Sequence, residues 1–396
     1  MRGLAVAALV VVALGAAARP AAAQHGRMGL IEARPGDTPP VVQLYTFGRG
    51  ALIFEKFGHT ALCLDYREPE RETACFNYGV TDFTIPGATL TWRFIRGKQV
   101  FFVEAIPLSG MMAFYKHEDR TIWKQDLPFT AEQARAAEAK LLDDLDPKKG
   151  SYIYDHFVDN CTTRLRDIID RASGGRLRDG ADRRFPLTLR QMGRRGLAEL
   201  PPLIAFADFA LGRYLDHRPT VWEAMFHPFV LRDEVEAEFG VKPELIYERR
   251  GPPIPEDGPT DRPWALLIGL GLMLPLAVAR LTGRFERAAL AIGAVPAGLL
   301  GVVLWGVAII STIPTVRWNE ALVLYVPFDL ALPFLGAARR QRYARVRLGM
   351  VVVASLLCAV GLFRQPLWIP IVIAFALHGL TSVELGGLLR RGAVRE

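Results

Sequence analysis

The last third of the chain constrains the fold most, because it consists of apolar segments separated by short basic loops. Five such segments follow one another, at about 264–279, 288–310, 321–335, 348–363 and 367–380. A bilayer core about 30 Å thick needs about 20 apolar helical residues to cross it, so some of the segments are short. Prolines interrupt several of them, a break that neighbouring helices can accommodate. The sequence therefore predicts a transmembrane bundle of about five helices over residues 264–396.

The arginines between these segments predict which ends face the cytoplasm. If the residues before the bundle lie outside, the loops after the first, third and fifth segments are cytoplasmic. Those loops hold Arg280, Arg284, Arg287, Arg339, Arg340, Arg342, Arg345, Arg347, Arg390, Arg391 and Arg395. The outer loops hold only Arg317 and Arg364. This asymmetry follows the positive-inside rule. It explains the net charge of +7 without a nucleic acid, and we expect no nucleic acid partner.

Residues 1–23 have the features of a secretory signal peptide. Arg2 supplies the positive start, an apolar run continues to Ala18, and the alanines at 21–23 fit a cleavage site. An uncleaved anchor is the alternative interpretation. Both the signal and the arginine asymmetry place the following domain outside the cytoplasm, in a protein that spans the inner membrane several times.

The part before the bundle is predicted to be an α+β domain. Strand patterns cover 41–45, 60–66, 74–80 and 100–106. A helix opens at Thr130, where Gln133 completes a capping box, and a second helix begins after Asn160 and runs to about Ala172. Residues 186–248 have a mostly helical pattern and are interpreted as an extension of the domain. Residues 249–263, rich in Pro, Gly and acidic residues, are predicted to be a linker.

The four cysteines divide into different predicted roles. Cys358 lies in an apolar segment and is interpreted as a packing residue. Cys63 and Cys75 flank a charged turn, and a turn centred near Pro69 would place them opposite each other on antiparallel strands. A disulfide between them fits an oxidising compartment. Cys161 is then the odd thiol.

Cys161 follows a good helix-capping residue, Asn160, and so falls in the first turn of a helix. A helix N-terminus stabilises an anion, which favours the thiolate form of a cysteine. These features make Cys161 a candidate nucleophile. The alternative is a buried structural cysteine.

A thiol nucleophile needs a base, and His59 is the best placed of seven histidines. It heads an apolar strand directly after a glycine, whereas His25 lies near the predicted mature terminus and His378 lies in an apolar segment. The competitors are His117, His156, His217 and His227, and His59 itself has a structural alternative. Strand alternation places Asn77 on the same face, diagonal to His59, as the group that orients the imidazole. Asp65 shares that face farther along. We expect no metal and no cofactor, because no strong ligand cluster or phosphate loop is present.

Two of these stretches resemble a known family. Phe57-Gly58-His59 at a strand start, followed later by Asp159-Asn160-Cys161-Thr162-Thr163-Arg164 at a helix start, is similar to the Lnb-like periplasmic-domain family. Weaker matches are Phe76-Asn77-Tyr78-Gly79-Val80, Phe94-Ile95-Arg96-Gly97-Lys98 and Met225-Phe226-His227-Pro228 with Leu231. The resemblance covers most of 41–238. It implies a circularly permuted papain-like (NlpC/P60-type) catalytic domain over 24–185, followed by a C-terminal transmembrane region.

The resemblance also implies lipoprotein N-acyltransfer. An acyl chain would move from a membrane phospholipid, the donor, through a thioester on Cys161 to the amino group of a lipoprotein, the acceptor. His59 would transfer the proton, and backbone N–H groups would stabilise the oxyanion. Tyr154, Asn160 and Arg164 are expected to contact substrate, with a structural ion pair as the alternative for Arg164. Competing hypotheses are a cell-wall peptidase or amidase, and a non-catalytic envelope assembly module.

Overall fold

The computed structural model describes residues 28–52, 55–82, 84–257 and 262–383, which form two compact units. The first unit contains the described residues up to 197 together with 218–256. The second contains 198–217 and the described residues from 257 onward. The segment 186–248 is thus divided between the units, and 249–256 belongs to the first unit rather than to a free linker. The predicted signal peptide and Arg390, Arg391 and Arg395 lie outside the described residues.

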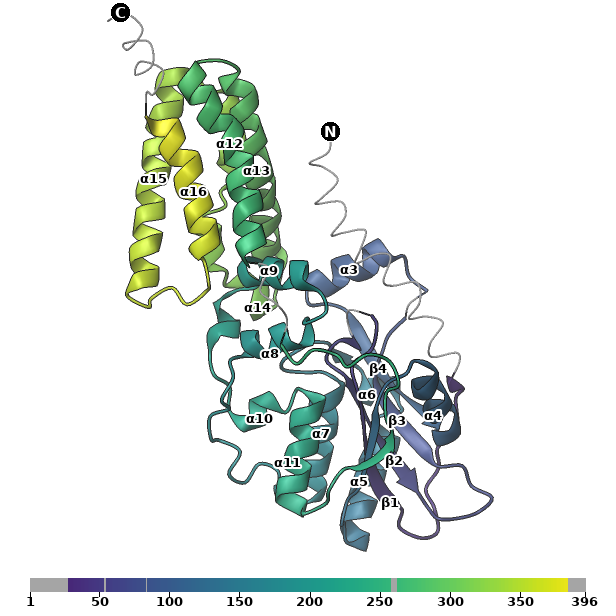
Figure 1. Ribbon diagram of the computed structural model, residues 1–396. Coiled ribbons are helices and arrows are strands. Elements are labelled where there is room, and N and C mark those ends of the chain that lie inside the picture. Colours follow the sequence, from purple (N-terminus) through teal and green to yellow (C-terminus); the bar gives the residue numbers. More distant parts are fainter. Residues whose placement is uncertain (1–27, 53–54, 83, 258–261, 384–396) are drawn as a thin grey trace, which may run out of the picture. The chain divides into compact units, whose positions relative to one another are not determined.

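The first unit is built on a seven-stranded antiparallel sheet with the strand order β6-β4-β3-β2-β1-β5-β7 (Figure 1). The strands are β1 (Val41–Phe47), β2 (His59–Asp65), β3 (Ala74–Val80), β4 (Val100–Pro107), β5 (Ile122–Asp126), β6 (Tyr152–Ile153) and β7 (Glu244–Tyr247). The four predicted strands are present. The sequence analysis missed β5, β6 and β7, because each has five residues or fewer and little apolar alternation.

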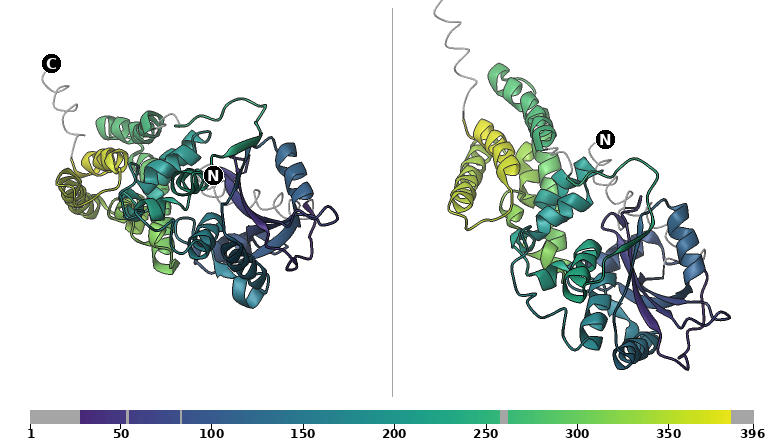
Figure 2. Two further views of the ribbon diagram at one scale, coloured as in Figure 1. Left: turned by 90° about the horizontal axis from the view of Figure 1, so that it is seen from below. Right: turned by 60° about the horizontal axis from the view of Figure 1, so that its bottom comes forward.

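Helices cover both faces of this sheet, as Figures 1 and 2 show. The helices of the unit are α3 (Gly87–Ile95), α4 (Leu108–His117), α5 (Ala131–Asp143), α6 (Pro147–Gly150), α7 (Cys161–Ala172), α8 (Leu189–Gly196), α10 (Val221–Ala224) and α11 (Pro228–Phe239). One core joins α5, α7 and α11 to the face that carries Leu62 and Leu64. The second core joins α4 to the opposite face, which carries Ala61 and Cys63.

The strand register fixes which residues meet across β2 and β3. Leu62 pairs with Phe76, and Cys63 pairs with Cys75. The two cysteines are joined by a disulfide on the α4 side of the sheet. By continuation of this register, Ala61 lies opposite Asn77. Asn77 is therefore diagonal to His59.

The second unit contains a bundle of four long helices. Its elements are α9 (Pro201–Ala210), η2 (Arg213–Asp216), α12 (Arg262–Thr282), α13 (Glu286–Ile310), α14 (Pro314–Arg317), η3 (Glu320–Val323), η4 (Pro327–Phe334), α15 (Ala337–Ala359) and α16 (Trp368–Ser382). Among the described residues, α12 and α13 are long and apolar enough to cross a bilayer. The third predicted segment, 321–335, is not an α-helix but two short 3₁₀ helices.

This 3₁₀ segment nevertheless returns along the bundle, antiparallel to α13. The indole of Trp305, late in α13, donates to the carbonyls of Leu322 and Tyr325, each at 3.1 Å. At the other end, Arg340, just after the segment, pairs with Glu286 at the start of α13, at 2.8 Å. The chain therefore passes along the bundle five times, with α-helices in four passes and 3₁₀ turns in the third.

A buried ion pair accounts for the irregular third pass. Arg347, predicted in a cytoplasmic loop, instead lies within α15 and is 2% exposed. Its guanidinium contacts both carboxylate oxygens of Asp329 at 3.1 Å and donates to the carbonyls of Val323 and Leu324 at 2.9 and 2.6 Å. Backbone groups left without helical partners must be satisfied inside an apolar bundle, and this arginine satisfies two.

We predict that Asp329→Ala destabilises the bundle by about 3–5 kcal/mol, because it leaves the Arg347 charge buried without its partner. The measurement is thermal denaturation of the detergent-solubilised full chain. The double variant Asp329→Leu, Arg347→Met should recover only part of the loss, because it removes the unpaired charge but leaves the Val323 and Leu324 carbonyls without their donor. Arg342→Ala, at an exposed position of the same helix, should change little. Equal stability of Asp329→Ala and the native protein would refute a structural role for the pair.

Candidate active site

Cys161 is the first residue of α7, and Asn160 caps that helix. The Asn160 side-chain oxygen accepts hydrogen bonds from the backbone N–H groups of Thr162 and Thr163, both at 2.9 Å. The Thr163 hydroxyl oxygen in turn accepts from the Asn160 N–H at 2.8 Å. A reciprocal cap of this kind satisfies donors that the first turn cannot pair internally. The start of α7, and with it the position of the thiol, is therefore well defined.

Asn160 was expected to contact substrate, but the structure gives its side chain a different role. Its amide nitrogen donates to the carbonyls of His156 and Phe226, at 2.9 and 3.0 Å. The residue is only 4% exposed. Every polar atom of the amide is thus occupied by backbone, so Asn160 positions Cys161 rather than binding a ligand.

Arg164 was expected either to contact substrate or to form a structural ion pair, and the structure shows the ion pair. It forms a two-pronged pair with Asp159, with both N–O distances at 2.6 Å. Its guanidinium also lies over the Tyr152 ring, 4.4 Å from the centroid. The arginine therefore ties the loop before Cys161 to the sheet edge.

His59 begins β2, and its Nε2 hydrogen-bonds the Asn77 side-chain oxygen on β3. Since an amide oxygen can only accept, Nε2 carries the proton and Nδ1 is left with a free lone pair. Among the described residues, none hydrogen-bonds that Nδ1. Gly58, just before the histidine, has a φ of +86°, and a Cβ there would come within 2.7 Å of the Phe47 carbonyl. Glycine is required at this position for the strand to begin with His59.

Several contacts bring the Cys161 helix against the beginning of β2. The hydroxyl of Thr60, next to His59, donates to the hydroxyl of Thr162, next to Cys161, at 3.1 Å. On β3, a Cβ added to Gly79 would lie 3.8 Å from the Cys161 Cβ, so the absent side chain leaves space beside the thiol. Tyr115 of α4 stacks near His59, with ring centroids 6.3 Å apart, and is also in electrostatic reach of Cys161. Thr60 on β2 and Tyr115 on α4 thus lie next to both sequence-predicted residues.

Both partners are neutral at rest. Burial raises the pKa of the Cys161 thiol, and hydrogen bonds with Thr162 and Thr60 offset only part of this. Burial, assisted by the Arg120 charge, lowers the pKa of His59 to about 4. The helix N-terminus was expected to favour the thiolate, but burial is the larger effect. The site therefore holds a neutral thiol and a neutral imidazole at the same end of the sheet, and groups of this kind can transfer a proton during attack on a carbonyl once they meet.

The tyrosines before Cys161 include one candidate that the sequence analysis missed. Tyr154 lies in electrostatic reach of Cys161, but its hydroxyl already contacts His156 Nδ1 at 3.2 Å. Tyr152 is 5% exposed, and its hydroxyl has no hydrogen-bond partner among the described residues. That hydroxyl is 3.9 Å from the position of a Cβ on Gly79, beside the thiol. Tyr152 and Tyr154 are two residues apart in an extended segment, so position along the chain does not distinguish them.

Two further buried histidines, His156 and His227, pack near the segments that carry Cys161 and His59. His156 packs against Phe57 and Phe226, with ring centroids at 4.3 and 5.6 Å. His227 caps α11 by accepting the Phe229 N–H at 3.3 Å. Burial lowers the pKa of His156 to about 4 and that of His227 to about 3. Both imidazoles are therefore neutral at physiological pH, and each combines ring packing with a hydrogen bond through Nδ1.

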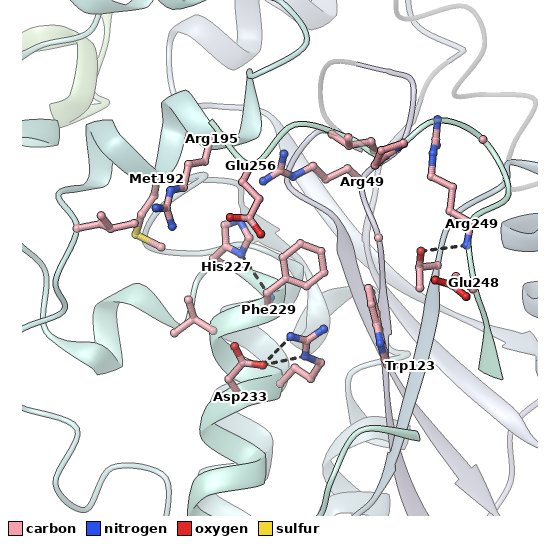
Figure 3. Close-up of a pocket in the computed structure, with 18 of the residues that line it drawn as sticks. Arg49, Trp123, Met192, Arg195, His227, Phe229, Asp233, Glu248, Arg249 and Glu256 are labelled. Carbon is pink, nitrogen blue, oxygen red and sulfur yellow. Dashed lines mark hydrogen bonds and ion pairs between the residues drawn. The ribbon is translucent and has the colours of Figure 1, made fainter. Parts of the chain in front are cut away.

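A separate cavity of about 770 Å³ lies next to this region but does not include Cys161 or His59. It is formed by the β1 and β5 side of the sheet, by α8 and α11, and by residues 248–256. Figure 3 shows His227 at its floor with Arg49, Arg195 and Glu256 around it. The segment predicted as a linker thus forms one wall. Since the cavity lacks the nucleophile, we assign it no catalytic step.

Comparison with known proteins identifies one domain. Residues 39–195 match the model of the Lnb N-terminal periplasmic domain. No curated protein and no solved structure gives a significant match. Among the described residues, no group of three or more His, Cys, Asp or Glu side chains could hold a metal ion.

We predict that alkylation of Cys161 by iodoacetamide has a pH midpoint above that of a cysteine peptide, because burial disfavours the thiolate. Alkylation is measured by mass spectrometry in a Cys358→Ala background, where Cys161 is the remaining free thiol. Rapid alkylation at pH 6 would instead indicate a preformed thiolate–imidazolium pair.

The neutral buried histidines also predict a pH-dependent stability. Their pKa values are lower in the folded state than the unfolded value of about 6.5, so their contribution is complete above pH 6.5 and is lost as pH falls toward 4. Each loses up to about 1.4 kcal/mol per pH unit. His227→Asn, which preserves a capping oxygen, should reduce this dependence of Tm, whereas His117→Asn at an exposed position should not. An unchanged pH profile in His227→Asn would contradict the assignment.

Proposed function

This chain carries an Lnb N-terminal periplasmic domain over residues 39–195, and on that premise we propose that it is a thiol-dependent acyltransferase of the cell envelope. The donor is a membrane phospholipid and the acceptor is the N-terminal amine of a lipoprotein. The protein is anchored in the inner membrane by its bundle, with the catalytic domain in the periplasm. The order of a His strand before a Cys helix supports a permuted papain-like arrangement of the domain.

One observation carries the proposal. The Asn77 oxygen holds the proton of His59 on Nε2, so the opposite ring nitrogen is the one able to accept a proton. The same sheet end carries Cys161 through the Thr60–Thr162 contact. A nucleophile, a base and a group that orients the base are the parts that covalent acyl transfer needs.

The proposed first step forms a thioester. As the Cys161 sulfur attacks the ester carbonyl carbon, its proton passes to His59 Nδ1. The tetrahedral intermediate carries an oxyanion, which the unpaired Tyr152 hydroxyl and the Cys161 backbone N–H would stabilise by hydrogen bonds. The C–O bond then breaks, and His59 returns the proton to the leaving alcohol. The products are an acyl-enzyme and a lysophospholipid.

In the second step the lipoprotein amine attacks the thioester carbonyl. His59 accepts a proton from the amine, the C–S bond breaks, and the proton returns to sulfur. An amide replaces a thioester, so the reaction requires neither a nucleotide nor an outside reductant. The neutral resting state of His59 suits both steps, because the ring must begin each one without a proton.

Hydrolysis of wall peptides is the competing function, since the same three groups could cleave an amide. The bundle favours a lipid substrate. Extracting a chain of about 15 methylenes into water costs about 12 kcal/mol at about 0.8 kcal/mol each. An enzyme that uses such chains must therefore work at the bilayer, whereas a peptidase would need only a single anchoring helix.

We predict that the full chain, supplied with phospholipid and a diacylglyceryl lipopeptide with a free amine, adds one acyl chain to the lipopeptide. Cys161→Ser and His59→Ala should each reduce the rate by at least about 100-fold, and the double variant should be no slower than the slower single variant. Intact mass spectrometry would record both the acyl-enzyme and the product.

The matched control is Cys358→Ser, which removes the other free cysteine and should leave the rate unchanged. If the lipopeptide stays unmodified while peptidoglycan fragments are cleaved, the acyltransfer proposal is wrong and the peptidase hypothesis is favoured. Full turnover in Cys161→Ala would end the thiol mechanism.

A further inference from the structure

Exposed apolar side chains in the catalytic unit occur mainly on α3 and on the segment that leads into Cys161. Six large hydrophobic residues among the described part of this unit are exposed, and four of them lie on segments that adjoin the site. These four, here called the apolar rim, are Trp92 (50% exposed), Phe94 (41%), Ile153 (45%) and Val158 (56%). Isolated exposed apolar residues are common, but a group of this kind marks an interaction surface.

Contacts link the apolar rim to the nucleophile. The Phe94 ring lies 6.0 Å from the ring of Tyr154, which is in electrostatic reach of Cys161. Ile153 precedes Tyr154 and pairs with Val100 on β4, directly after α3. Val158 belongs to the turn before α7, where its N–H donates to Asp155. The rim thus comes from α3, β6 and the turn that leads to Cys161.

The helix that contributes two of the four rim residues also carries positive charge. The stretch 87–98, which contains α3, has Arg93, Arg96 and Lys98 and no acidic residue. No residue of α3 is buried, so the helix is not held by the core of the unit. An exposed helix with Trp and Phe beside Arg and Lys is typical of an element that lies in the interfacial layer of an anionic membrane.

We propose that the apolar rim and the basic residues of 87–98 dock on the surface of an anionic phospholipid bilayer, close to the segment that leads into Cys161. This inference rests on the proposed function, because docking would let a donor acyl chain reach Cys161 without passing through water. Charge selects the partner: a lipid head-group layer supplies the negative charge that Arg93, Arg96 and Lys98 complement. The same chain also carries two helices of membrane-crossing length, so a bilayer is always within reach.

The test places a nitroxide label in the full chain reconstituted in phosphatidylglycerol-rich nanodiscs. Trp92→Cys reports on the rim, and Leu245→Cys, an exposed apolar position on β7, is the matched control. Both are made in a Cys161→Ser, Cys358→Ala background. Spin-label accessibility is compared for oxygen, which concentrates in lipid, and a nickel chelate, which stays in water. The ratio of oxygen to nickel accessibility should be several-fold higher at position 92 than at 245.

Equal ratios at the two positions would overturn the proposal, and so would shielding of position 92 from both reagents, which would indicate a protein partner. Arg93→Glu combined with Lys98→Glu should lower the ratio at position 92. In a separate measurement, Trp92→Ala with Phe94→Ala should raise the KM for vesicle phospholipid several-fold while changing little for a water-soluble short-chain ester. The spin-label experiment does not require enzyme turnover. It can therefore show that membrane docking is absent or present whether or not the protein transfers acyl chains.

Discussion

The candidate active site depends most on the hydrogen bonds of the Asn160 side-chain amide. Its oxygen receives two N–H groups of α7, and its nitrogen reaches the carbonyls of His156 and Phe226. The apolar face of α7 fixes the helix on the sheet through residues such as Leu165 and Ile169. The core thus sets the axis of the helix, and Asn160 sets where it begins. Together they leave Cys161 at one point beside Gly79, whose φ of +99° is a conformation that residues with a β-carbon rarely adopt.

The uncharged resting state of Cys161 and His59 suits the proposed phospholipid substrate, which is largely hydrocarbon. An ion pair in a site closed by an acyl chain would lose its hydration, a cost of several kcal/mol per ion. A thiol and a neutral imidazole avoid this cost before the reaction begins. Arg120 contributes to this state: its buried guanidinium, which donates to the Gly48 carbonyl at 2.8 Å, disfavours a second positive charge on His59.

Much of the candidate site could be predicted because its signals are local. Capping preference located the start of α7, and strand alternation placed Asn77 on the face of His59. The sign of the Cys161 pKa shift could not be predicted, because burial depends on segments far apart in the chain. Tyr152 was missed for a related reason: its unpaired hydroxyl is visible only once Gly79 lies beside it.

The elements with a regular pattern of apolar residues were predicted, whereas the elements that depend on contacts with distant parts of the chain were missed. The bundle and four strands have regular patterns, whereas β7 is a four-residue edge strand that depends on pairing with β5. The hydropathy of 321–335 also predicted a helix. Pro327 and the hydrogen bonds from Arg347 to two backbone carbonyls favour 3₁₀ turns instead. Arginine counting could not distinguish Arg347 from the loop arginines, because only its pairing with Asp329 sets it apart.

The pairing of Arg347 with Asp329 has a consequence for biogenesis. On the proposed topology, a translocon receives η4 before α15, with Asp329 eighteen residues ahead of its partner. Either charge alone would cost about 2.5–3.5 kcal/mol at the centre of a membrane helix. Entering together, the two residues neutralise each other, and Arg347 satisfies the open carbonyls of the preceding pass. The third and fourth passes are therefore expected to leave the translocon as one hairpin, so that a ribosome pause between them would be harmful, whereas one after α13 would not.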